Sequence, residues 1–180
     1  MYFEESGAVN TAVTVEQAVK IAKEKGLGHI VVASVTGDTA LLLAEKTKLK
    51  VVCVTHVYGF KEPGANQMED SVRQRLEQKG VAVLTTTHVL SGVERGISNY
   101  KGGMYPAEIM SNTLRFFGQG LKVCVEVAIM ALDAGLVPFG EDIVAIGGTG
   151  RGADTAVVIR PAHANEVFQT SIRQVICKPY

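Results

Sequence analysis

Residues 30–45 read IVVASVTGDTALLLAE: an apolar, β-branched run, a short hydroxyl-rich loop and then a helical pattern. This order predicts a buried strand, a loop around Gly37 and a helix that begins at about Thr39. Backbone N–H groups at the start of that helix, with the hydroxyls of Ser34, Thr36 and Thr39, favour a bound anion. The alternative is structural, because a Thr or Asp before a buried helix also caps it.

Outward from this stretch, predicted strands alternate with predicted helices, which is typical of a parallel sheet covered on both faces. Strands are expected at residues 29–34, 51–55, 81–85 and 142–147, with an antiparallel partner at 155–160 and a final edge strand at 172–178. Helices are expected at residues 15–25, 39–46, 106–117 and 121–134, and from a cap at Asn66 to Lys79. We therefore expect a single α/β domain over residues 1–180, with three αβα layers and a mostly parallel sheet that has an antiparallel C-terminal edge.

Residues 88–120 interrupt this alternation. Between His88 and Pro106 the chain carries four glycines and two tyrosines without a clear period. A connection of this length without structure is usually a functional lid or a disordered segment. We therefore expect residues 88–120 to be a glycine- and aromatic-rich insertion that forms either a lid or a disordered segment.

Composition limits the partners that this chain can have. Its 180 residues include 18 Lys plus Arg and 18 Asp plus Glu, and no basic tract stands out. Binding to nucleic acid or to an anionic membrane surface therefore has no electrostatic support. The three cysteines lie in apolar runs without CxxC spacing, which favours buried, reduced thiols. With no apolar stretch long enough to cross a bilayer and no signal-peptide pattern, we expect a cytoplasmic protein.

Polar or flexible residues follow each of the four predicted parallel strands, and the carboxyl ends of such strands meet at one edge of the sheet. These residues are Ser34, Thr36, Gly37, Asp38 and Thr39; Thr55 and His56; Thr86 and His88; and Gly148, Thr149, Gly150, Arg151 and Gly152. Helix N-termini point to the same edge, which brings Asn10, Thr11 and residues 118–122 into its neighbourhood. We expect this edge to form a crevice for a small ligand.

Four residues near this edge are candidates for catalysis: His56, His88, Lys122 and Glu126. A histidine is suited to general acid or base work, and a lysine to holding negative charge in a transition state. The alternative interpretation makes the histidines hydrogen-bonded structural residues and Lys122 and Glu126 an ordinary i, i+4 pair. Glu126 lies in an apolar run, so its carboxylate needs a partner or a shifted pKa.

Other common site motifs are not found. The glycine-rich loop at residues 147–153 leads into a strand, so it is not a GxGxxG dinucleotide fingerprint. No segment matches GxxxxGK[ST]. The two histidines on separate strands fit no metal-ligand spacing, so we expect no metal site.

Two loops carry a resemblance to a known family. SVTGDTA at residues 34–40, between a strand and a helix, and GTGRGADTAVVI at residues 148–159 resemble the C-terminal α/β domain of pyruvate kinase. In that domain the first loop binds a phosphate of an allosteric sugar bisphosphate, and the later loop folds across the ligand. The resemblance implies a phosphate cradle made by Ser34, Thr36, Gly37, Asp38 and Thr39, with Thr149, Gly150, Arg151 and Gly152 closing over it.

The chain as a whole resembles the small stand-alone members of this family. It has no room for the catalytic barrel of pyruvate kinase, so pyruvate kinase activity is not implied. The resemblance implies instead that the crevice binds a phosphorylated small molecule such as FMN, in a binding or regulatory role. Two alternatives stay open: an enzyme that acts on a phosphorylated substrate with His56 or His88 as acid or base, and a structural domain that self-associates through helix 121–134 and the final strand.

Overall fold

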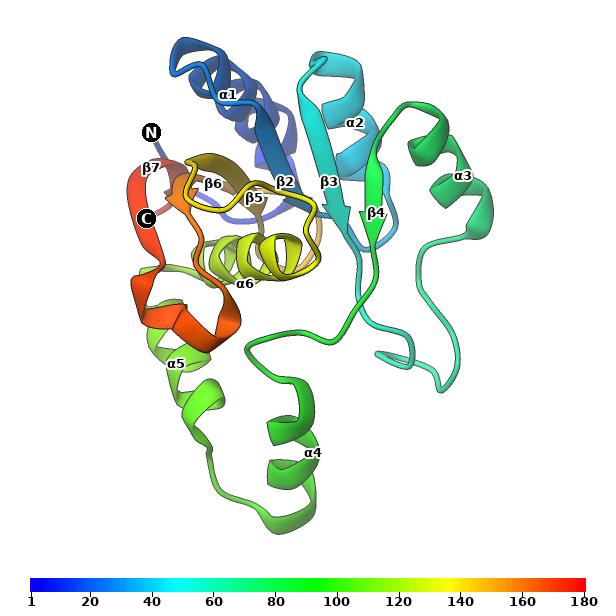
Figure 1. Cartoon of the computed structure of the whole chain (residues 1–180), viewed down its shortest axis with the longest axis vertical. Coiled ribbons are helices and arrows are strands. Elements are labelled where there is room, and N and C mark those ends of the chain that lie inside the picture. The colour runs from blue at the N-terminus through cyan, green and yellow to red at the C-terminus, as the bar shows by residue number, and fades with distance from the viewer.

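A seven-stranded sheet runs through the centre of the computed structural model, which describes residues 1–180 (Figure 1). Its strand order is β1-β7-β6-β5-β2-β3-β4. Strands β2, β3, β4 and β5 are parallel to one another, whereas β6 is antiparallel to both of its neighbours. The strands are β1 (Tyr2–Phe3), β2 (His29–Ala33), β3 (Lys50–Val54), β4 (Ala82–Leu84), β5 (Ile143–Gly147), β6 (Thr155–Arg160) and β7 (Ser171–Pro179). The predicted mostly parallel sheet with antiparallel C-terminal strands is confirmed.

Helices cover both faces of this sheet, so the predicted three layers are also confirmed (Figure 1). Helices α1 (Thr11–Glu24), α2 (Asp38–Lys46) and α3 (Asp70–Gln78) pack on one face, and α6 (Gln119–Asp133) packs on the other. The remaining helices are α4 (Gly92–Lys101), α5 (Pro106–Leu114) and three short 3-10 segments, η1 (Ala8–Asn10), η2 (Arg115–Phe117) and η3 (Ala164–Gln169).

The central strands are apolar on both faces because both faces are buried. In β2, Ile30 and Val32 join the apolar cluster under α1 and α2, whereas Val31 joins the cluster under α6. Each such side chain contributes about 1.5–3 kcal/mol by leaving water. The β-branched runs in the sequence are therefore the direct cause of the layered fold.

Three local predictions were wrong. Residues 92–101 form α4, although their glycines hid the helical period. The final strand is not at the edge of the sheet, because β1 pairs with β7 on its outer side. Asn66 does not cap α3, which begins at Asp70, since its Oδ1 instead accepts a hydrogen bond from Met68 N–H at 2.8 Å in the preceding turn.

None of the helices combines the length and the apolar character that crossing a bilayer requires.

Candidate functional site

A cleft of about 670 Å³ opens at the carboxyl ends of β2 and β5. It lies between the loop that follows β2 and the glycine-rich loop that follows β5, as expected for a ligand site in a parallel sheet. Nine of the predicted site residues line it: Ser34, Thr36, Asp38, Thr39, His56, Gly148, Gly150, Arg151 and Gly152. The sequence therefore located the cleft and most of its polar wall.

Three helices direct their N-termini at this cleft. Thr11 of α1, Thr39 of α2 and Gln119 of α6 all line it, and these helices are 14, 9 and 15 residues long. Each helix N-terminus carries unpaired N–H groups and a partial positive charge. The charged side chains in the lining are Asp38, Lys61 and Arg151, which leaves one net positive charge. The cleft is therefore suited to an anion.

The loop before α2 holds hydroxyl groups that are available to a ligand. Thr39 is only 6% exposed and lines the cleft, yet no hydrogen bond in the structure uses its hydroxyl. Ser34 Oγ accepts a weak hydrogen bond from Ala40 N–H at 3.4 Å, so its own proton is free to be donated. Thr36 is already engaged, because its Oγ1 donates to Asp38 Oδ2 at 2.8 Å. Thr39 thus presents to the cleft a hydroxyl that has no protein partner, whereas the fully buried hydroxyl without a partner is that of Thr14.

Gly37 belongs to the loop but does not line the cleft. Its φ is +97°, a conformation that favours glycine, and a Cβ there would overlap the side chain of Val72 on α3. The glycine is required because α3 packs directly against the turn. Gly37 therefore has a packing role in the loop, and its contact with a ligand stays a prediction.

Asp154 holds the glycine-rich loop in place through hydrogen bonds, a role that the sequence analysis missed. Its side chain is fully buried, and Oδ2 accepts hydrogen bonds from Gly7 N–H at 2.8 Å and Thr149 N–H at 3.2 Å. Thr11 Oγ1 accepts a further bond from Ala153 N–H at 3.0 Å. Thr149 does not line the cleft, because its N–H is committed to Asp154. A lone acidic residue before an apolar strand was the available signal.

His56 lines the cleft, and His88 lies beside it but outside the cleft lining. The ring centroids of the two histidines are 5.5 Å apart, and Phe60 stacks on His56 at 3.8 Å. His56 Nδ1 is hydrogen-bonded to Gln67 Oε1 at 2.8 Å. Burial lowers the pKa of His88, and the charges of His56 and Lys122 act in the same direction, whereas Glu126 opposes them. His88 is therefore held mainly neutral near pH 7.

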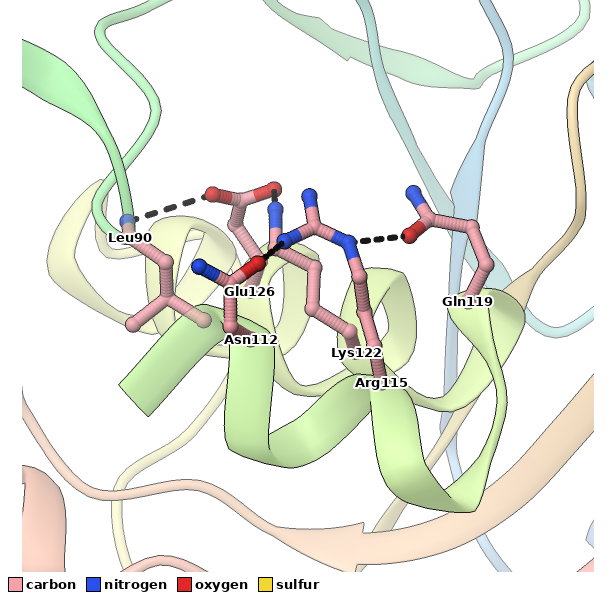
Figure 2. Close-up of polar contacts among 6 residues, drawn as sticks. All are labelled: Leu90, Asn112, Arg115, Gln119, Lys122 and Glu126. Atoms are coloured by element: carbon pink, nitrogen blue, oxygen red, sulfur yellow. Dashed lines mark hydrogen bonds and ion pairs between the residues drawn. The ribbon is translucent and has the colours of Figure 1, made fainter. Parts of the chain in front are cut away.

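Lys122 and Glu126 form a buried ion pair on α6 (Figure 2). Lys122 Nζ lies 2.5 Å from Glu126 Oε2, and Glu126 Oε1 accepts a hydrogen bond from Leu90 N–H at 3.1 Å. The carboxylate thus has partners for both oxygens, as a buried charge requires. Neither residue lines the cleft, so the structure favours the pairing interpretation over direct contact with a ligand.

Next to this pair, Arg115 of η2 is hydrogen-bonded to one residue of α5 and to one residue of α6 (Figure 2). Its Nη1 donates to Asn112 Oδ1 at 2.6 Å, and its Nε donates to Gln119 Oε1 at 2.7 Å. The same Gln119 lines the cleft and is the one residue of 88–120 that does so. In this structure the rest of the predicted lid segment lies outside the cleft lining.

The other predicted residues lie outside the cleft. Thr55 is buried and its hydroxyl is 2.7 Å from Thr85 Oγ1, so it joins the ends of β3 and β4. Thr86 and His88 line a separate cavity of about 380 Å³ beside α6, together with Asp133.

Two polar residues of the cleft lining, Lys61 and Gln67, were missed by the sequence analysis. They belong to the turn after β3, and nothing in its glycine- and proline-containing sequence shows which way it folds.

The cysteines and the side chains that could bind a metal ion do not form a further site. Cys53, Cys124 and Cys177 are all free and buried. No three His, Cys, Asp or Glu side chains are arranged to hold a metal ion.

The chain is similar to parts of known proteins. The family model described as "Pyruvate kinase, alpha/beta domain" matches residues 12–159. Two solved structures of pyruvate kinase from Cryptosporidium parvum, one in complex with ADP, are similar to the chain at 16% identity. Their TM-scores are 0.43 and 0.44, and the matches cover 82% and 83% of this chain. The chain spans 22% of the length of each.

Proposed function

Since the chain belongs to the pyruvate kinase alpha/beta domain family, we propose that its cleft binds a small molecule through a phosphate group. The observation that carries this proposal is Thr39, a largely buried residue at the N-terminus of α2 that lines the cleft and whose hydroxyl has no protein partner. A phosphate oxygen accepts hydrogen bonds from such a hydroxyl and from the backbone N–H groups beside it. Arg151, across the cleft, adds a charge-assisted bond.

The ligand that we propose first is FMN, as the family resemblance implied. A cleft of about 670 Å³ lies within the range of about 300–1,000 Å³ typical of cofactor-sized sites. Ser34, Thr39 and Arg151 would hold the phosphate, and the stacked His56 and Phe60 offer an aromatic wall for a planar ring. When bound, a flavin supplies hydride and electron transfer, and the protein supplies its position and surroundings.

The purified chain tests this proposal directly. Calorimetric titration should show binding of FMN and much weaker binding of riboflavin, which has the same ring without the phosphate. Thr39→Val keeps the shape of the side chain and removes its hydroxyl, so it should weaken FMN binding about tenfold, as the loss of roughly 1.4 kcal/mol implies. Arg151→Ala should weaken it at least as much.

Arg75→Ala is the matched control, because Arg75 is an exposed arginine outside the cleft lining. It should bind FMN as the wild type does. Sugar phosphates are titrated in parallel, since binding of these without FMN would keep the phosphate site and reject the flavin. Failure of every phosphorylated molecule to bind would overturn the proposal.

A second function is acid or base catalysis on the bound molecule, and the position of His88 beside His56, which lines the cleft, favours it. A neutral His88 behind His56 is suited to passing a proton to or from a ligand. Replacing both histidines with glutamine should then abolish turnover of a phosphorylated substrate while phosphate binding persists. Turnover that survives the double replacement would exclude these roles.

We also propose a cytoplasmic location without nucleic-acid partners. Three free, buried thiols suit a reducing compartment. The balance of 18 basic and 18 acidic residues supports a small anionic ligand over a polyanion.

A further inference from the structure

Residues 92–117, here called the arm, stand apart from the layers of the domain (Figure 1). The arm consists of α4, α5 and η2, and it connects β4 to α6. No residue of α4 is buried, and Ser111 is the one buried residue of α5. The arm therefore has no apolar core of its own.

The contacts between the two arm helices are polar. Glu94 Oε2 accepts hydrogen bonds from the N–H groups of Ala107 at 2.8 Å and Glu108 at 3.3 Å, at the start of α5. Ser98 Oγ donates to Glu108 Oε1 at 2.9 Å. Polar side chains thus fill the inside of the hairpin, where a helix normally turns its apolar face.

Several apolar side chains of the arm are exposed, although Leu114 packs against the apolar cluster under α6. Val93 is 79% exposed, Tyr100 81% and Phe116 85%. The exposed surface continues onto η3, because Phe168, 90% exposed, borders an apolar groove of about 480 Å³ along α5. The polarity of the arm is therefore inverted relative to a helical hairpin that is surrounded by water.

The short length of the arm helices and the exposed apolar area around them both favour a partner. Helices of 10 and 9 residues, the lengths of α4 and α5, are marginal in water without packing. Four exposed rings lie on the arm and on the neighbouring η3: Tyr100, Phe116, Phe117 (58% exposed) and Phe168. At about 150–250 Å² per ring, they expose about 500–800 Å² together, close to the ~800 Å² per partner of a stable interface.

Charge points to a second copy of the chain as that partner. The formal net charge is zero, so two copies do not repel each other at a distance. The charges of the arm are mixed in sign, at Glu94, Arg95, Lys101, Glu108 and Arg115. They do not form the basic face that binds an anionic membrane. We propose that the arm is a dimerisation surface, on which the arm of a second copy packs about a two-fold axis.

Sedimentation velocity across the micromolar range tests this proposal. The wild type should sediment as a dimer that dissociates on dilution, and Phe116→Glu should sediment as a monomer with an unchanged circular dichroism spectrum. Phe139→Glu is the matched control, because Phe139 is 72% exposed but lies outside the arm. It should remain dimeric.

A second measurement leaves the surface apolar. The chain has no tryptophan, so Tyr100→Trp places a single indole on α4. Its emission should be that of a buried indole at high concentration and should shift to longer wavelength on dilution. A monomeric wild type, even one that binds vesicles or another protein, would overturn the proposal. So would a dimer that Phe116→Glu leaves intact, or an indole that is exposed at every concentration.

Discussion

At the scale of single residues, His88 makes the stability of the fold depend on pH. The unfolded chain titrates this histidine at about 6.5, whereas burial lowers its pKa in the folded chain. Below pH 6.5 the unfolded chain therefore binds more protons, and the free energy of unfolding falls until the pH passes the folded pKa. His88→Gln should remove this loss, as urea unfolding at pH 8, 6 and 5 would show.

His29 contributes to the same slope, because burial and the charge of Lys50 also lower its pKa. The single His88→Gln variant should therefore keep part of the pH dependence, and a variant with both histidines replaced should keep less. If the slope between pH 8 and 5 is the same in His88→Gln and the wild type, the environment of His88 has been misread.

The cysteines should be inert in the folded chain. Burial raises the pKa of Cys53 to about 12 and also raises the pKa values of Cys124 and Cys177. Because the thiolate is the reactive form, a disulfide reagent at pH 8 should release no thiol signal within minutes from the native chain. In urea it should titrate three thiols per chain, the number in the sequence. Fast reaction of one thiol without urea would contradict this.

At the scale of elements, the Lys122 and Glu126 pair joins α6 to the base of the arm. Lys122→Met leaves a buried carboxylate without its cation and should cost about 3–5 kcal/mol of unfolding free energy. Adding Glu126→Gln removes the stranded charge and keeps an oxygen for Leu90 N–H. The double variant should therefore recover most of the loss in urea unfolding. Equal stability of the single and double variants would argue against a desolvated pair.

At the scale of the whole molecule, the N-terminal strand β1 and the C-terminal strand β7 pair at one edge of the sheet. Met1 N donates to Ile176 O at 2.9 Å, and the rings of Tyr2 and Tyr180 stack at 5.4 Å. Deleting residues 1–6 would uncover the outer edge of β7, so the shortened chain should aggregate with increasing concentration in light scattering. Val175→Lys on β7 adds a charge to that edge and should suppress the aggregation. Lack of aggregation in the shortened chain would mean that the edge is protected in another way.

The sequence predicted those parts of the fold and site that depend on local pattern. The β-branched runs of β2, β3 and β5 predicted the parallel core, because both faces of these strands are buried. Helix α4 of the arm was not predicted, because Val93, Ile97 and Tyr100 have helical spacing but are interrupted by glycines, which normally weaken a helix. β1 has only two residues, too few to show alternation.

The site was predicted where strand ends carry it and missed where a turn does. Ser34, Thr39 and Arg151 follow strands, so their common edge could be inferred from topology. Lys61 and Gln67 reach the cleft through a turn whose path depends on packing. The packing role of Gly37 could not be predicted, because it depends on Val72 of α3, which is distant in the sequence.

The hydrogen bond between Gly7 N–H and Asp154 joins residues that are 147 positions apart. During synthesis, Asp154 leaves the ribosome late. Until then the glycine-rich loop lacks the hydrogen bonds that hold it, and the cleft has only the wall formed by the loop after β2. The phosphorylated molecule that we propose for the cleft would therefore find its complete site only on a finished chain. Its binding would stabilise that folded chain, so its supply in the cell should change how long the protein survives.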